Sequence, residues 1–172
     1  DDNTITNTFN TSNPISDTAS RQLAGDGGGT DYEYTRSSTI QPTEYYILMK
    51  GLQRDGHDGD ESRSYIGNSS TRNIAVFFEL EANGDFRVNQ DTKTSWSIGT
   101  TYKLRAYNMD WNNKVFDWEF INYANKNVLA GSSGESFFNT NTSSLDLVHY
   151  GMSNGGSGGT VETLYDDLSI VL

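Results

Sequence analysis

Residues 164–172, the last nine of the chain, alternate in polarity as a β-strand does. Leu168, Ile170 and Leu172 fall on one side of this strand, and the polar or smaller side chains fall on the other. By the same count, Asp166 points in the direction of Leu168 and Ile170, toward the interior. An unpaired buried carboxylate is costly, so the sequence predicts that Asp166 has a partner there.

The rest of the chain repeats this pattern of short alternating runs separated by turns. Residues 73–81 form the strongest run, with Ile74, Val76, Phe78 and Leu80 alternating inward, and Asn83-Gly84 is a hairpin turn signature. Seventeen glycines and only two prolines suit a protein with many turns. The sequence predicts an all-β fold, a two-sheet antiparallel β-sandwich of about ten strands without helices, in which residues 53–71 form a long polar loop.

The length of 172 residues predicts a single domain, residues 1–172. Residues 1–30 contain few apolar anchors and are predicted to be an edge strand or an N-terminal arm. Within them, residues 4–9 could add as a strand to the sheet edge of a neighbouring molecule.

The composition excludes several classes of partner. A net charge of −11 argues against nucleic acid and against anionic membranes, and no apolar run is long enough to span a membrane. The chain has no cysteine, so it has neither disulfides nor thiolate metal sites. It begins without a basic or apolar leader, from which we expect a removed signal peptide and an extracellular location.

Residues 73–172 resemble the concanavalin A-like (laminin G-like) jelly rolls found in many carbohydrate-binding modules. The resemblance lies in the order of an apolar strand, residues 96–104, Asp110-Trp111-Asn112-Asn113-Lys114, residues 145–148, a glycine-rich loop and Asp166-Asp167-Leu168. It implies a jelly roll, and also a structural calcium ion that is bound by an inward aspartate of the last strand and by oxygens of the N-terminal segment. That aspartate would be Asp166, with Asp2 or Asp26 as its partner.

The catalytic motifs of this fold are missing. Relatives that cleave β-glucans carry Glu-x-Asp-x-x-Glu on one strand, and the chain has no such motif and no alginate lyase pattern. Asp117 and Glu119 are interpreted as a solvated strand face, and the two histidines, His57 and His149, lack metal-ligand spacing. We therefore expect no enzyme. The acidic residues 55–61 could hold calcium or could be a solvated loop, and the sequence leaves both open.

Aromatic rings that reach the surface are the expected means of binding sugars. Trp111, in a turn, is the first choice for an exposed ring, with Tyr107, Asp110 and Asn113 beside it, although a packed turn ring remains an alternative. The other candidate rings are Tyr46, Tyr65, Trp96 and Tyr123.

The sequence favours a secreted, non-catalytic, lectin-like module that binds a polysaccharide or a surface glycan. The alternative is a structural subunit of an extracellular filament or surface layer, which would assemble through its N-terminal strand.

Overall fold

The computed structural model describes residues 5–10, 20–26, 30–54, 61–153 and 160–172. These residues form strands and turns, and none of them forms a helix that could cross a membrane. The strands are β1 (Ile5–Asn10), β2 (Ser20–Asp26), β3 (Thr30–Ile40), β4 (Glu44–Arg54), β5 (Glu61–Gly67), β6 (Ile74–Glu81), β7 (Asp85–Val88), β8 (Asp91–Ser95), β9 (Thr101–Asp110), β10 (Val115–Asn122), β11 (Val128–Ser136), β12 (Leu145–Ser153) and β13 (Thr160–Val171).

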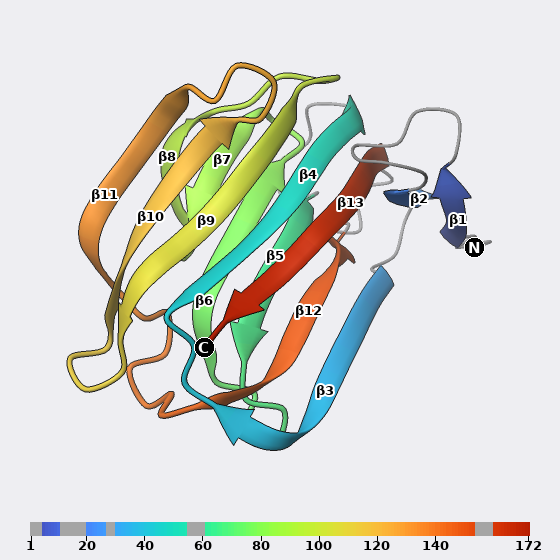
Figure 1. Ribbon diagram of the computed structural model, residues 1–172. Helices are drawn as coiled ribbons and strands as arrows, with labels where there is room; N and C mark the ends of the chain where they lie inside the picture. The colour runs from blue at the N-terminus through green and yellow to red at the C-terminus, as the bar shows by residue number, and fades with distance from the viewer. Residues whose placement is uncertain (1–4, 11–19, 27–29, 55–60, 154–159) are drawn as a thin grey trace.

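The strands build two antiparallel sheets that pack face to face (Figure 1). The seven-stranded sheet has the order β1-β2-β13-β4-β9-β10-β11, and the six-stranded sheet has the order β3-β12-β5-β6-β7-β8. In both sheets, strands that are distant in sequence lie next to each other, as β13 does between β2 and β4. The prediction of an all-β, two-sheet antiparallel sandwich is confirmed.

The core lies between the sheets and is rich in aromatic rings. Val76, Phe78 and Leu80 of β6 are fully buried, as the alternation predicted, whereas Ile74 at the start of the strand is only half-buried. Phe86 stacks on Phe120 of the other sheet with ring centroids 4.1 Å apart. Aromatic side chains bury large areas, so this layer supplies much of the apolar contact between the sheets.

Residues 53–71 are not a single loop as predicted, because β5 lies within them. The inward positions of β5 include Ser62 and Ser64, which are buried but polar. Their hydroxyls form hydrogen bonds with Thr163 and Tyr45 of the other sheet. Because two of the inward residues are serines, the strand lacks the apolar alternation by which it could have been recognised.

The predicted inward direction of Asp166 is wrong, because β13 contains a bulge. Asp166 pairs with Leu48 and Ser169 pairs with Tyr46, so three steps along β13 match two steps along β4. Asp167, within the bulge, has a positive φ of 43°. The extra residue shifts the alternation by one, so Tyr165 is buried and Asp166 is half-exposed.

The aromatic layer yields a prediction about stability. Phe78→Ala should lower the free energy of unfolding by about 3–5 kcal/mol, because it leaves a cavity among rings that cannot close around it. Urea denaturation followed by tryptophan fluorescence measures this change. Phe138→Ala, at a half-buried ring packed on the edge of Phe77, should cost clearly less. Equal losses for the two variants would contradict the central place of Phe78.

Candidate functional site

Trp111, the first choice for an exposed sugar-stacking ring, is buried. Its exposed fraction is 8%, its indole packs edge-on against Phe137 at 4.9 Å, and its Nε1 donates a hydrogen bond to the carbonyl of Pro42 at 2.8 Å. The prediction of an exposed ring is therefore wrong. The sequence marked the turn, but the residues that cover the ring come from distant segments.

The predicted neighbours of Trp111 do not form one surface with it. Asp110 accepts hydrogen bonds from the backbone amides of Asn112 and Asn113, each at 2.9 Å, and from the side chain of Asn113 at 2.7 Å. The amide of Asn113 is the main cause of a lowered pKa at Asp110. Tyr107 lies elsewhere, on the outward side of β9, with the guanidinium of Arg105 4.4 Å from its ring centre. Asp110 and Asn113 thus shape the turn.

The other candidate rings are also buried or already in contact with other side chains. Trp96 is buried, while ammonium groups lie over Tyr46 and Tyr123, at 3.8 Å and 3.5 Å from their ring centres. Tyr65 is half-buried on the outward side of β5 and stacks on His149 with ring centroids 3.9 Å apart. Tyr65 lies on the same side of β5 as Glu61 and Arg63, so its ring shares a sheet face with charged side chains.

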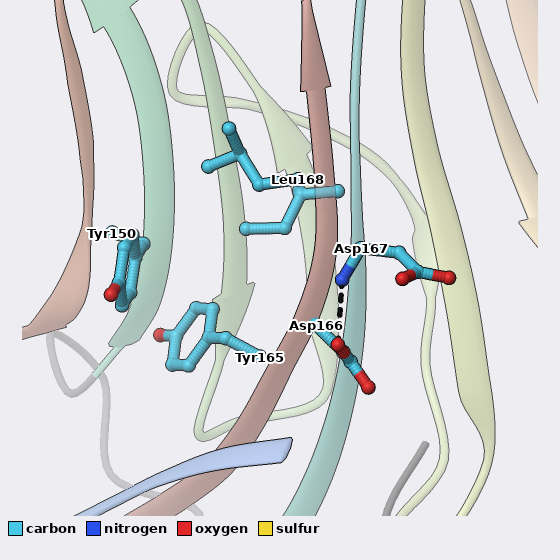
Figure 2. A pocket seen from close by; sticks show the side chains of 6 residues that line it. Tyr150, Tyr165, Asp166, Asp167 and Leu168 are labelled. Atoms are coloured by element: carbon cyan, nitrogen blue, oxygen red, sulfur yellow. Dashed lines mark hydrogen bonds between the residues drawn. The ribbon is translucent and has the colours of Figure 1, made fainter. Parts of the chain in front are cut away.

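Asp166 lies at a small pocket beside the bulge in the middle of β13 (Figure 2). The pocket measures about 140 Å³, and its walls include Tyr150, Tyr165 and Leu168. The carboxylates of Asp166 and Asp167 point away from the two tyrosine rings, and Asp166 accepts a hydrogen bond from the amide of Asp167 at 2.8 Å (Figure 2). The side of the pocket that faces between the sheets is therefore aromatic and apolar.

The predicted calcium site around Asp166 does not come together with Asp26. Asp26 lies opposite Thr160, six residues before Asp166 along β13, which corresponds to about 20 Å of strand. Two strand positions that far apart cannot both supply a ligand to an ion whose oxygen ligands lie at about 2.3–2.6 Å. Asp2 lies outside the described residues, as do residues 55–60 of the acidic loop.

A different group of acids does come together, on the outward side of the six-stranded sheet. We call this group the acidic cluster; it consists of Glu61 of β5 and of Glu79 and Glu81 of β6. One carboxylate oxygen of each residue lies within 4.8 Å of those of the other two. In the part of the chain that the structure describes, this is the one group of acids and histidines that could hold a metal ion. Glu79 and Glu81 are each only 1% exposed, although they lie on the face opposite the aromatic core.

Two arginines balance part of this charge. Arg63 forms an ion pair with Glu61 at 3.2 Å, and Arg87 forms one with Glu81 at 2.6 Å. The pKa of Glu79 is raised to about 9, first by burial and then by the hydrogen bond and the negative charge of Glu61. Glu79 Oε2 has no hydrogen-bond partner among the described residues. A buried acid with a strongly perturbed pKa is typical of functional sites.

The sequence contained a signal for this cluster. Glu79 and Glu81 occupy the alternate positions of the most apolar strand, and strand residues of that parity must share a face. Glu61 completes the cluster only because β5 pairs with β6, with Glu61 opposite Glu81. The interpretation of residues 53–71 as a loop hid that pairing.

The burial of Trp111 leads to a prediction. Trp111→Ala should destabilise the fold by about 3–5 kcal/mol, because it removes a large buried ring. Tyr107→Ala, at a half-buried ring on the outward face, should cost less than about 1.5 kcal/mol, the range of a single surface ring contact. Chemical denaturation of both variants measures the difference. An unchanged unfolding midpoint for Trp111→Ala would contradict its burial.

Glu79 makes stability depend on pH. Its pKa is higher in the folded state than the ordinary value of 4.5, so the folded protein binds more protons than the unfolded chain between about pH 4.5 and 9. The free energy of unfolding should therefore fall as the pH rises through this window, in buffer that contains a chelator. Glu79→Gln should flatten the fall and raise the melting temperature at pH 8. Identical pH profiles for the two proteins would contradict the raised pKa.

Comparison with known proteins gives a fold but no sequence relative. No protein-family model matches the chain, and no curated protein matches it. A sialidase structure superposes on 90% of the chain with a TM-score of 0.68 and 10% identity, and the chain spans only 15% of that protein.

Two smaller proteins match over nearly the whole chain. An endo-β-1,4-glucuronan lyase from the fungus Trichoderma reesei has a TM-score of 0.68 and 9% identity, with 99% of this chain and 88% of the lyase covered. The carbohydrate-binding module CBM66 from Bacillus subtilis has a TM-score of 0.52 and 12% identity, with 98% and 94% covered. Identities this low show the fold alone. The chain has a concanavalin A-like jelly-roll fold, and the solved structures that share this shape include both a lyase and a carbohydrate-binding module.

Proposed function

We propose that this protein is a non-catalytic, lectin-like carbohydrate-binding module that binds a polysaccharide or surface glycan on the outward side of its six-stranded sheet. The observation that carries the proposal is the surface around Tyr65, where an aromatic ring lies among charged side chains on a sheet face. The fold supports it, because proteins of this shape include a carbohydrate-binding module and a polysaccharide lyase.

The chemistry of this face suits a sugar. The C–H faces of a sugar ring stack on aromatic rings, while its hydroxyl groups need donors and acceptors beside the ring. Tyr65 is held by stacking on His149 and by an edge contact with Phe77, with ring centroids 5.6 Å apart. Arg63, opposite Glu79 on the neighbouring strand, adds guanidinium donors on the same face, and a half-buried ring held in this way loses little freedom when a ligand binds.

The geometry of the acidic cluster supports a non-catalytic role. Glycosidases place their two carboxyl groups about 5–5.5 Å or 6.5–9.5 Å apart, so that they flank the bond that is cleaved. In the acidic cluster, Glu79 and Glu81 are each only 1% exposed, so their carboxyl groups do not line an open cleft. A sugar bond has little room between them.

The alternative of a filament subunit has less support. In the structure, β1 pairs with β2 of the same chain, and β2 pairs with β13, so residues 5–10 extend their own sheet. That placement favours the module. An extracellular location and a bound calcium ion remain part of the proposal, as expectations from the sequence.

A binding experiment tests the proposed face. Wild-type protein should be retained on a polysaccharide affinity gel or a glycan array, and Tyr65→Ala should weaken binding about tenfold, the loss expected for one aromatic contact. Tyr65→Phe keeps the ring and should retain most of the affinity. Tyr107→Ala, on the other sheet, is the matched control and should bind normally.

Three outcomes would overturn the proposal. Loss of binding in Tyr107→Ala with normal binding in Tyr65→Ala would move the site to the seven-stranded sheet. Shortening of a bound polysaccharide, measured as new chain ends, would show an enzyme. No binding together with concentration-dependent sedimentation of large assemblies would favour the filament subunit.

A further inference from the structure

The acidic cluster poses an electrostatic problem in the middle of the six-stranded sheet. Strand pairing places Glu61 directly opposite Glu81, and Glu79 lies two residues away on the same side of β6. Like charges directly opposite each other destabilise a sheet. Burying a carboxylate without a counter-charge adds a larger cost. A fold that keeps three acids so close needs a bound proton or a cation between them.

The arginines balance only part of the negative charge of the acidic cluster. Each of the two pairs with one member of the acidic cluster, Arg63 with Oε1 of Glu61 and Arg87 with Oε1 of Glu81. Glu79 shares a hydrogen bond with Glu61, but within the described residues it forms no ion pair, and its Oε2 has no hydrogen-bond partner although the side chain is only 1% exposed. A buried carboxylate oxygen without a hydrogen-bond partner, close to two other acids, is where a positive ligand would bind.

We propose that Glu61, Glu79 and Glu81 bind a divalent metal ion, calcium, on the outward side of the six-stranded sheet. Two of the six carboxylate oxygens form the ion pairs with the arginines. Calcium takes six to eight oxygens in irregular arrangements and accepts water among them, so each acid can contribute an oxygen while water completes the shell. Glutamate oxygens are hard ligands that suit calcium, magnesium or manganese better than metals that prefer sulfur or nitrogen. Magnesium requires a near-ideal octahedron and keeps several waters, which suits a group of closely spaced buried carboxylates less well.

The ion would have a structural role. It would join β5 to β6 on the face that also carries Tyr65. This ring lies four residues from Glu61 on the same side of β5. Calcium would thereby stiffen the strand that positions this ring. The inference names the residues that would bind the calcium ion of the proposed function. It does not depend on sugar binding, because a structural ion in the acidic cluster would bind whether or not a sugar does.

Calcium titration of metal-free protein tests the proposal. The full chain is treated with EDTA, dialysed, and titrated with calcium chloride by isothermal titration calorimetry, with thermal unfolding measured in parallel. We expect one calcium ion per chain and a melting temperature that rises with calcium and falls again with EDTA, because an ion that binds only the folded state stabilises it. Magnesium at the same concentration should raise the melting temperature less.

Glu79→Gln is the decisive variant. It keeps the shape of the side chain and replaces an ionisable carboxyl group with a neutral amide, so it should fold at least as well as the wild type in EDTA, as judged by circular dichroism. Its calcium affinity should fall at least about tenfold, and its thermal response to calcium should be lost. Glu119→Gln is the matched control, because Glu119 is also a strand glutamate paired with an arginine, on the other sheet. It should bind calcium as the wild type does.

Several results would overturn the proposal. Wild-type protein that shows neither binding heat nor a thermal shift with calcium has no such site. A calcium response that survives Glu79→Gln but disappears in Asp166→Asn would move the ion to the bulge of β13. An equal response to magnesium would overturn the choice of calcium.

Discussion

The packing of β6 against the opposite sheet is the constraint from which the rest of this structure follows. Val76, Phe78 and Leu80 are completely buried, and the rings around Phe78 connect the two sheets. Once these three side chains are inside, the backbone has no freedom over where Glu79 and Glu81 point. The same strand therefore packs the core on its inward side and places two buried acids close together on its outward side.

The interior is not apolar throughout. Beside the aromatic layer, β5 meets the seven-stranded sheet through hydroxyl groups: Tyr45 with Ser64, and Ser62 with Thr163. The hydroxyl of Tyr165 likewise donates to the carbonyl of Gly151 in the opposite sheet. Burial raises the pKa of both tyrosines, so these groups stay protonated and can donate. Buried polar groups that satisfy one another in this way hold two sheets in one register.

Both proposals depend on the strand that this polar packing positions. β5 has serines on its inward side and Glu61, Arg63 and Tyr65 on its outward side, so it supplies one acid of the cluster, one of the arginines that balance it and the ring proposed to meet a sugar. This face is acidic near the start of β5, at Glu61, and aromatic four residues further along the strand, at Tyr65. A module that binds glycans needs a rigid ring at its surface, and an ion that joins β5 to β6 would provide that rigidity.

The sequence by itself determined the fold class, because alternation with period two and frequent turn residues leave few alternatives to a β-sandwich. It also determined the inward side of β6. Only the tertiary structure decided the direction of Asp166, since a bulge adds one residue to the count, and the burial of Trp111, since Pro42 and Phe137 come from distant segments. The acidic cluster was decided by the pairing of β5 with β6. Local patterns show which side of a strand is apolar. The register of strand pairing and the burial of a side chain under other segments depend on contacts between residues far apart in the chain.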